Sequence, residues 1–225
     1  MLIPYHDLVK KFNIKDVTGI LHVGAHDCEE LGAYNSCGVT IDNIFWVEAM
    51  DAKIKKNKAR YGNKLNIYQC LVYDENDKEF DFNITNNGQS SSILQFGSHS
   101  TNHPHVKVVN QEKLKTTRLD KLIEMNQIPI EKLNFVNLDI QGVELRALKS
   151  MEKYLQHVKY IYSEVNTEQV YKGCDQIEQI DEYLKQFGYE RVATKIYEEY
   201  GWGDAFYMKK QKKSLNNMIG KMNFT

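Results

Sequence analysis

The chain has 225 residues, of which 42% are hydrophobic and 26% charged, and its 29 basic and 30 acidic side chains leave a formal net charge of −1. This composition excludes an intrinsically disordered chain, and the length is enough to bury a core without a disulfide or a structural metal. The balanced charge creates no general field for a polyanion, so we expect no nucleic-acid partner. The apolar runs are too short for a membrane span, and the N-terminal residues lack the apolar core of a signal peptide.

The cysteines bear on the cellular compartment, and the C-terminal tail bears on possible contacts with anions. Cys28, Cys37, Cys70 and Cys174 lie far apart and form no CxxC pair. This spacing indicates neither a zinc site nor a disulfide framework, so we expect reduced thiols and a cytoplasmic protein. Residues 210–225 are rich in lysine and contain no acid. Such a tail can touch phosphate or anionic lipid, but a solvated chain end is the simpler interpretation.

Short apolar strands alternate with helical patterns along most of the chain. In chain order, the predicted elements are a strand at 19–24, a helix at 29–35, a strand at 43–48, a helix at 51–61, a strand at 65–72, a half-exposed strand at 79–84, a helix at 119–126, a strand at 133–139, a helix at 143–154, a strand at 158–165, a helix at 177–187, and strands at 189–197 and 204–209. Residues 85–111 are rich in Asn, Gly, Ser and His, which predicts a long loop that acts as a lid or binding loop.

Repeated strand–helix units favour parallel strands with right-handed crossovers, and therefore an α/β fold with a doubly wound sheet. The last two strands are joined by too few residues for a helical crossover, so that pair is predicted to be antiparallel. No linker or internal repeat divides the chain. We therefore predict a single domain over residues 1–225, with its core at about 19–209.

The ends of the first two strands carry a candidate cofactor site. The first strand ends in Gly24-Ala25, small residues that let a backbone approach a ligand closely, and the second ends in Glu48. An acid at that position can accept hydrogen bonds from both hydroxyls of a ribose. Neither GxGxxG nor GxxxxGK[ST] is present. A turn with a single glycine fits S-adenosylmethionine, which carries no phosphate, better than it fits a dinucleotide.

The order of these motifs resembles the FkbM-type methyltransferases over most of the chain, from about residue 19 to 209. The D-x-Q-G-x-E element is the most specific part. The matching segments are Ile20-Leu21-His22-Val23-Gly24-Ala25-His26, Phe45-Trp46-Val47-Glu48, Gln89-Ser90-Ser91-Ser92, Thr117-Arg118-Leu119-Asp120, and residues 134–144, which read NFVNLDIQGVE. The chain departs from the pattern at His22, where an acid is commoner, and at Cys28, where a glycine is commoner.

The resemblance implies a Rossmann-like class I methyltransferase fold, with a seven-stranded, mostly parallel sheet, an antiparallel C-terminal strand and helices on both faces. It also implies an S-adenosylmethionine-dependent O-methyltransferase that acts on a hydroxyl, often that of a sugar or glycoconjugate. The implied cofactor contacts are Gly24, Ala25 and His26 at the methionine end, Glu48 at the ribose, Leu71 near the adenine and Asp139 by the methyl group.

Asp139 is the leading catalytic candidate, because it ends an apolar strand at the sheet edge where sites form. A sugar hydroxyl is a poor nucleophile until a base or a metal removes its proton, and Asp139 can act as that base. Glu144 lies in the first turn of the next helix and can share this role, although the helix dipole alone favours an acid there. Glu164 ends the next strand on the same rim and is a further catalytic candidate, with loop capping as the alternative.

Asn166, Trp202 and Asp204 are the candidates for substrate binding. Asn166 can bind hydroxyls, and Trp202 can stack on a sugar ring, although an aromatic residue in a terminal hairpin is more often part of a core. Asp204 follows Trp202 closely. A divalent cation near the carboxylates is an open alternative. Three histidines in the long loop lack the acid or cysteine that completes a metal site, so we assign no metal ligand: His99, His103 and His105.

Other functions stay open at this point. A methyltransferase acting on a small molecule or peptide needs the same cofactor residues with different loop contacts. A non-catalytic binding module on the same fold is motivated by His22 and Cys28. A nucleic-acid methyltransferase is least favoured because the charge is nearly balanced. The sequence is compatible with a homo-oligomer.

Overall fold

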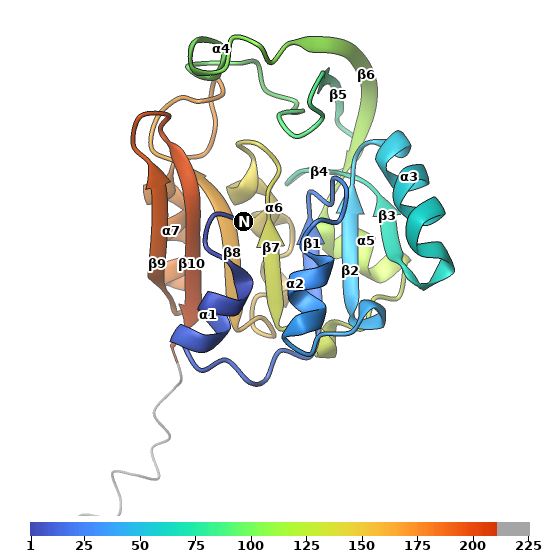
Figure 1. Cartoon of the computed structure of the whole chain (residues 1–225), viewed down its shortest axis with the longest axis vertical. Coiled ribbons are helices and arrows are strands. Elements are labelled where there is room, and N and C mark those ends of the chain that lie inside the picture. Colours follow the sequence, from blue (N-terminus) through green and yellow to red (C-terminus); the bar gives the residue numbers. More distant parts are fainter. Residues whose placement is uncertain (211–225) are drawn as a thin grey trace, which may run out of the picture.

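Figure 1 shows the computed structural model, which describes residues 1–210 of the chain. A large sheet stands at its centre, and a second, smaller sheet lies beyond one end of the strands. The lysine-rich tail noted in the sequence lies outside the described residues from position 211 onward.

The large sheet has seven strands, and only one of them runs against the others. β10 is antiparallel to both of its neighbours, and the other pairings are parallel. This confirms the predicted α/β fold, with its mostly parallel sheet and antiparallel C-terminal strand. In spatial order the strands are β3 (Asn66–Gln69), β2 (Ile44–Glu48), β1 (Ile20–Val23), β7 (Phe135–Leu138), β8 (Tyr160–Asn166), β10 (Trp202–Lys209) and β9 (Tyr189–Tyr197).

Helices cover both faces of this sheet, as predicted. Alternate residues of the fully buried strand β1 point to opposite faces, as the two-residue period of a strand requires. Ile20 packs in one hydrophobic cluster, whereas Leu21 and Val23 pack in the other. The Ile20 face is covered by α1 (Tyr5–Lys11), α2 (Leu31–Ser36) and α3 (Asp51–Tyr61), and the Leu21 face by α5 (Leu119–Met125), α6 (Glu144–Ser150) and α7 (Ile177–Gln186).

The smaller sheet was not predicted, and two sequence predictions were wrong there. It contains β4 (Leu71–Val72), β6 (Val108–Thr117) and β5 (Glu79–Thr85) in that order. The predicted strand 65–72 is divided at Cys70, because β4 leaves the large sheet to pair with β6. The predicted loop 85–111 overlaps the start of β6, whose ladder with β5 is long-range and whose side chains are mostly exposed.

Smaller differences concern element ends. Helix α1 was not predicted. The helix predicted at 143–154 ends at Ser150, and the strand predicted at 204–209 begins two residues earlier, at Trp202. The other predicted helices and strands are present with shifted boundaries. The remaining helical segments are η1 (Ile41–Asn43), η2 (Gly62–Lys64), α4 (His99–Asn102), η3 (Ile130–Lys132) and η4 (Glu152–Tyr154).

Residues 86–107, which we call the cap, lie over the carboxyl ends of the central strands (Figure 1). Ser92, a cap residue, donates its hydroxyl proton to the Gln141 carbonyl oxygen over 2.9 Å. The Tyr171 hydroxyl lies 3.3 Å from the Ser90 carbonyl oxygen. The cap is therefore attached to the loops that follow β7 and β8.

Among residues 1–210, no helix combines the length and the apolar character that a membrane crossing requires.

Candidate functional site

A cavity of about 530 Å³ opens between the cap and the carboxyl ends of β1, β2, β7 and β8. Its size is typical of a small-molecule site, and it lies where the strand order reverses between β1 and β7. Ala25, Glu144 and Asn166 do not line it. Eight of the residues singled out in the sequence do: Gly24, His26, Glu48, Leu71, Asp139, Glu164, Trp202 and Asp204.

Gly24 lets the ends of β1 and β7 approach each other. Its φ is +93°, in the left-handed region that favours glycine. A Cβ at this position would lie 1.8 Å from the Asp139 carbonyl oxygen. Ala25 is buried in the cluster beneath the turn, and its N–H donates to Val47. The glycine is therefore required by the protein's own backbone.

Glu48 is held rigidly at the end of β2 with only 5% of its surface exposed. One carboxylate oxygen, Oε2, accepts the His26 backbone N–H at 2.7 Å, and the other, Oε1, accepts that of Met50 at 2.9 Å. Burial raises the pKa of Glu48 above its ordinary value. Each carboxylate oxygen has a second lone pair, so Glu48 can still accept two hydrogen bonds from a ligand.

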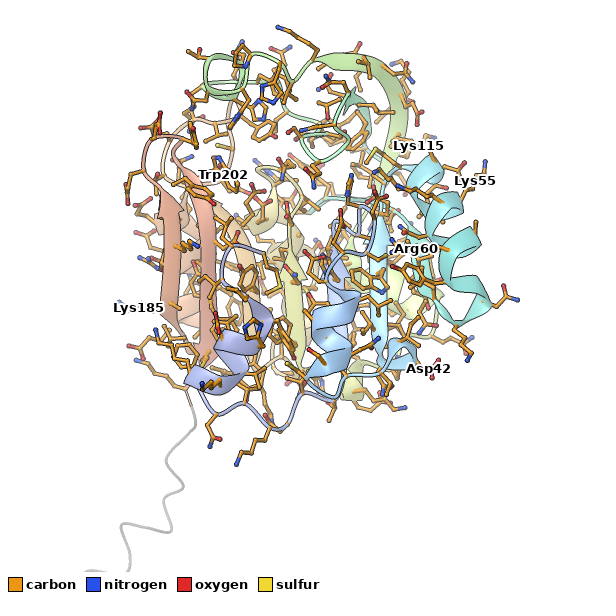
Figure 2. The ribbon with its side chains drawn as sticks, in the orientation of Figure 1. Asp42, Lys55, Arg60, Lys115, Lys185 and Trp202 are labelled. Carbon is orange, nitrogen blue, oxygen red and sulfur yellow. The ribbon has the colours of Figure 1, made fainter. Side chains whose placement is uncertain are left out.

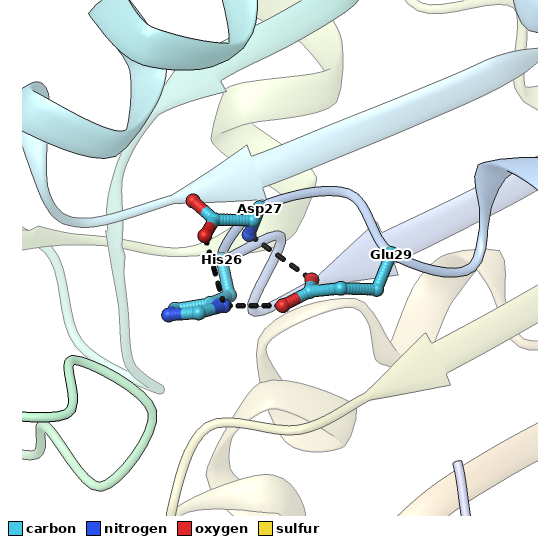
Figure 3. Close-up of side chains that lie close together, drawn as sticks. All are labelled: His26, Asp27 and Glu29. Atoms are coloured by element: carbon cyan, nitrogen blue, oxygen red, sulfur yellow. Dashed lines mark hydrogen bonds and ion pairs between the residues drawn. The ribbon is translucent and has the colours of Figure 1, made fainter.

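The turn after β1 carries a network of charged side chains (Figure 3). His26 Nδ1 lies 2.6 Å from Glu29, and its Nε2 lies 2.6 Å from Lys53 Nζ. Asp27 accepts from Lys53 at 3.1 Å and from Lys56 at 2.8 Å. His26, Asp27 and Glu29 are close enough to share a metal ion. The two lysines already neutralise this group, so the structure gives no support here to the divalent cation that the sequence left open as an alternative.

Gln141 bridges two carboxyl groups on the other side of the cavity. Its Nε2 donates to Asp139 Oδ1 and to Glu164 Oε2, each over 2.7 Å. Its Oε1 accepts the Tyr171 hydroxyl at 2.5 Å. Burial, and next the Asp139 charge, raise the pKa of Glu164 well above its ordinary value. Glu164 is therefore expected to be a protonated carboxyl group at neutral pH.

Glu144 has a structural role in the loop before α6. It is fully buried and accepts the N–H groups of Ile140 at 2.9 Å and Gly142 at 3.1 Å. Burial raises its pKa to about 8. This favours the structural alternative for Glu144 over the catalytic one. Asn166 is likewise buried away from the cavity.

The third wall comes from β10 and the cap. Asp204 is 5% exposed and accepts the Leu2 N–H at 2.5 Å together with the Tyr162 hydroxyl. It lies opposite Glu164 in the pairing of β8 with β10. Trp202 is half-buried at the start of β10, close to the cap (Figure 2).

Sequence analysis did not assign Gln141, Tyr171 or the cap residue His99 to the site. His99 is 6% exposed, stacks on Phe96 at a ring distance of 4.3 Å and has its Nε2 3.1 Å from the Ser90 hydroxyl. Gln141 could have been found from its place in the D-x-Q-G-x-E element. Tyr171 and His99 follow no spacing rule, because long-range packing brings them to the cavity.

Asp204 is expected to make stability depend on pH. Burial raises the pKa of its carboxyl from the ordinary 3.8 to about 6. Between these values the folded protein holds a proton that the unfolded chain has lost, so the stability contributed by Asp204 falls as pH rises from about 4 to about 6. We expect Asp204→Asn to remove this part of the pH dependence and to raise the relative stability above pH 6 by about 3 kcal/mol. Urea denaturation of both proteins across this range tests the prediction, and parallel pH curves would contradict it.

The strand order and the site at its switch point define a Rossmann-like methyltransferase fold. The crystal structure of the methyltransferase FkbM from Methylobacillus flagellatus superposes with a TM-score of 0.52 and 11% sequence identity, covering 86% of this chain and 44% of that one. The chain thus spans less than half the length of that protein. Magnesium protoporphyrin IX methyltransferase from Synechocystis, solved with bound S-adenosylmethionine, gives a TM-score of 0.47 and 8% identity over 90% of this chain and 74% of that one.

The sequence comparison identifies the family. The family model described as the methyltransferase FkbM domain matches residues 22–191. The chain therefore belongs to the FkbM methyltransferase family. No curated protein sequence matches it.

Proposed function

We propose that this protein is an S-adenosylmethionine-dependent O-methyltransferase that methylates a hydroxyl of a sugar or glycoconjugate. The observation that carries the proposal is the placement of Glu48 and Asp139 on the two sides of one cavity at the switch point of the sheet. Family membership supports methyl transfer in general. The choice of a hydroxyl acceptor rests on the polar wall formed by Asp139, Glu164 and Asp204.

The residues present fit this cosubstrate. Glu48 has free acceptor lone pairs for ribose hydroxyls, and Gly24 lines the same cavity, where the methionine end would lie. Among residues 1–210, no Lys or Arg lines the cavity, and the Met1 ammonium group that does is paired with Glu30 at 3.5 Å, so the site suits a ligand without phosphates. An apolar slot fits the adenine ring, and its lining residues are Met50, Leu71, Val72 and Phe82.

When bound, the cosubstrate supplies a methyl group carried on a positively charged sulfur. Transfer breaks the carbon–sulfur bond, forms a carbon–oxygen bond and releases the proton of the acceptor hydroxyl. Asp139 is the side chain placed to accept this proton, and Gln141 fixes its orientation through a 2.7 Å hydrogen bond. The cap and the strand ends hold the reactants together, which contributes through proximity.

We also assign the protein to the cytoplasm, because its four cysteines are free thiols. Transfer from methyl-labelled S-adenosylmethionine to a panel of oligosaccharides, peptides and small hydroxylated molecules tests the proposed function. Label recovered as a base-stable methyl ether on a sugar supports it. Label found only on peptides or non-sugar molecules contradicts the acceptor class. A folded protein that labels no acceptor in the panel contradicts the enzyme and leaves the binding module.

A further inference from the structure

Tyr171 connects the cap to the rim of the cavity. It lies in the loop after β8 and is only 1% exposed. Its backbone forms an isolated β-bridge with Phe96 of the cap, and the two rings lie 5.8 Å apart. The ring of His99, also in the cap, lies 5.4 Å from that of Tyr171. The cap therefore packs directly against this tyrosine.

The backbone of the cap is seated on the same loop. The Gly97 N–H donates to the Val170 carbonyl oxygen at 2.9 Å, and the Lys172 N–H donates to that of Gln95 at 2.8 Å. A Cβ at Gly97 would lie 1.9 Å from the Gln169 carbonyl oxygen. This close approach leaves no room for a side chain, so the position of Tyr171 depends on how the cap is seated.

The hydroxyl of Tyr171 fixes the amide of Gln141. A phenol has one proton to donate, and this one is donated to Gln141 Oε1 at 2.5 Å. Burial raises the pKa of the Tyr171 hydroxyl above its ordinary value, so the proton stays on the oxygen at neutral pH. Because the amide oxygen faces Tyr171, the nitrogen faces Asp139 and Glu164, each over 2.7 Å.

Without that hydroxyl, the amide has two possible orientations. The protonated carboxyl group of Glu164 can donate to an amide oxygen as well as accept from an amide nitrogen. A flipped Gln141 would then point its oxygen at the carboxyl groups, and Asp139 would lose the hydrogen bond that directs its Oδ1. The Tyr171 hydroxyl is thus the group that selects the observed orientation.

We propose that Tyr171 is a positioning residue that couples the seating of the cap to the orientation of Asp139 through the amide of Gln141. The inference rests on the proposed function, in which Asp139 accepts the proton of the acceptor hydroxyl. With the cap seated, the tyrosine holds the amide nitrogen on the carboxyl pair. With the cap displaced, the amide is free to flip. Proton transfer is then efficient only when the cap covers the reactants.

The side-chain amide of Gln141 reports this coupling without turnover. In protein labelled with nitrogen-15, its resonances are assigned by their absence from Gln141→Met. We expect the amide hydrogens to exchange with water at least about tenfold faster in Tyr171→Phe than in the wild-type protein. Phenylalanine keeps the ring that packs on Phe96 and removes only the hydroxyl.

Tyr189→Phe is the matched control for the loss of a buried hydroxyl. Tyr189 is 3% exposed, and its hydroxyl lies 2.9 Å and 2.8 Å from the carbonyl oxygens of Leu155 and Val158. It lies at the opposite end of the large sheet, where β9 and β10 reach the start of β8. This variant should keep the wild-type exchange of the Gln141 amide.

Gly97→Ala tests the contribution of the cap. Its methyl group forces the cap away from the Gln169 carbonyl oxygen while Tyr171 keeps its hydroxyl. We expect faster exchange of the Gln141 amide here as well. Gly32→Ala is the control, because nothing lies within 4 Å of the position its Cβ would take.

A double-mutant cycle tests the consequence for catalysis, using an acceptor found in the labelling screen. We expect Tyr171→Phe to lower kcat by about tenfold and to change the KM for S-adenosylmethionine by less than about twofold. In a Gln141→Met background the same substitution should lower kcat by no more than about twofold, because the hydroxyl acts through the amide. A general structural role would give equal losses in both backgrounds.

The outcomes separate this inference from the proposed function. Unchanged amide exchange in folded Tyr171→Phe, or equal losses of kcat in both backgrounds, would overturn the coupling and leave the methyltransferase intact. Wild-type exchange in folded Gly97→Ala would overturn the part assigned to the cap. Unprotected exchange of the Gln141 amide in the wild-type protein would overturn the coupling without any variant. Absence of methyl transfer by the wild-type protein would instead contradict the proposed function.

Discussion

Gly24→Ala is expected to lower the free energy of unfolding by about 3 to 5 kcal/mol. The new Cβ would lie 1.8 Å from the Asp139 carbonyl oxygen, and backbone atoms cannot rotate away as a side chain can. The end of β1 would have to separate from the end of β7, and Asp139, the candidate catalytic residue, directly follows β7. We therefore expect the binding of S-adenosylmethionine to be lost together with stability.

Gly38→Ala is the matched control for this effect. Its φ of +92° is nearly that of Gly24, but nothing lies within 4 Å of the position a Cβ would take. It should show the backbone strain alone, about 1 kcal/mol, and retain cosubstrate binding. Urea denaturation measures both variants. Equal losses of stability at the two positions would show that the close approach of Gly24 to Asp139 has no energetic effect.

Asp139→Asn is expected to reduce kcat by about 100- to 10,000-fold, the range of general base catalysis. The amide keeps the size of the side chain but cannot take a proton from the acceptor. The affinity for S-adenosylmethionine should change much less than kcat, because Asp139 is one of several groups at that end of the cavity. Measurement requires an acceptor identified in the labelling screen, followed by initial rates and a calorimetric titration.

The control for this variant is Asp42→Asn. Asp42 is exposed at the opposite end of the large sheet (Figure 2), so its variant should keep the wild-type rate. A kcat for Asp139→Asn within a factor of about three of the wild-type value would remove Asp139 from the role of base and leave proximity as the main source of acceleration.

The parallel part of the fold was predictable because its strands are short, continuous apolar runs. β1 and β7 are buried at every position, and such runs between helical patterns leave few alternatives to a parallel sheet. The positions of Gly24, Glu48 and Asp139 at the cavity followed from the same pattern, because parallel strands bring their carboxyl ends to one edge. The assignment of roles to these residues is still a proposal.

The smaller sheet could not be predicted from the same signals. β6 is exposed over most of its length, including Val109 with 62% of its surface exposed. Its polar sequence carries no alternation, since the ladder with β5 holds it rather than a buried face. The cap was predicted as a loop and, apart from α4, contains no helix or strand, but the hydrogen bonds of Ser90 and Ser92 that attach it to the rim of the cavity could not be predicted.

The sequence predicted which edge of the sheet carries the site residues, but not the direction in which each of their side chains points. Glu144 is close to Asp139 in the sequence, yet its carboxylate turns into its own loop, where buried N–H groups need an acceptor. Gln141 points the other way and joins Asp139 to Glu164. Gln141 also has a φ of +59°, a left-handed backbone conformation that residue spacing does not reveal.

Calorimetric titration with S-adenosylmethionine tests the central claim most directly, by comparing the wild-type protein with Glu48→Ala. The wild-type protein should bind one equivalent. The variant should bind about 100-fold more weakly, because two hydrogen bonds to a charged acceptor are lost. Urea denaturation of the variant confirms that it is folded. Absence of binding by the wild-type protein, or unchanged affinity in folded Glu48→Ala, would contradict the account.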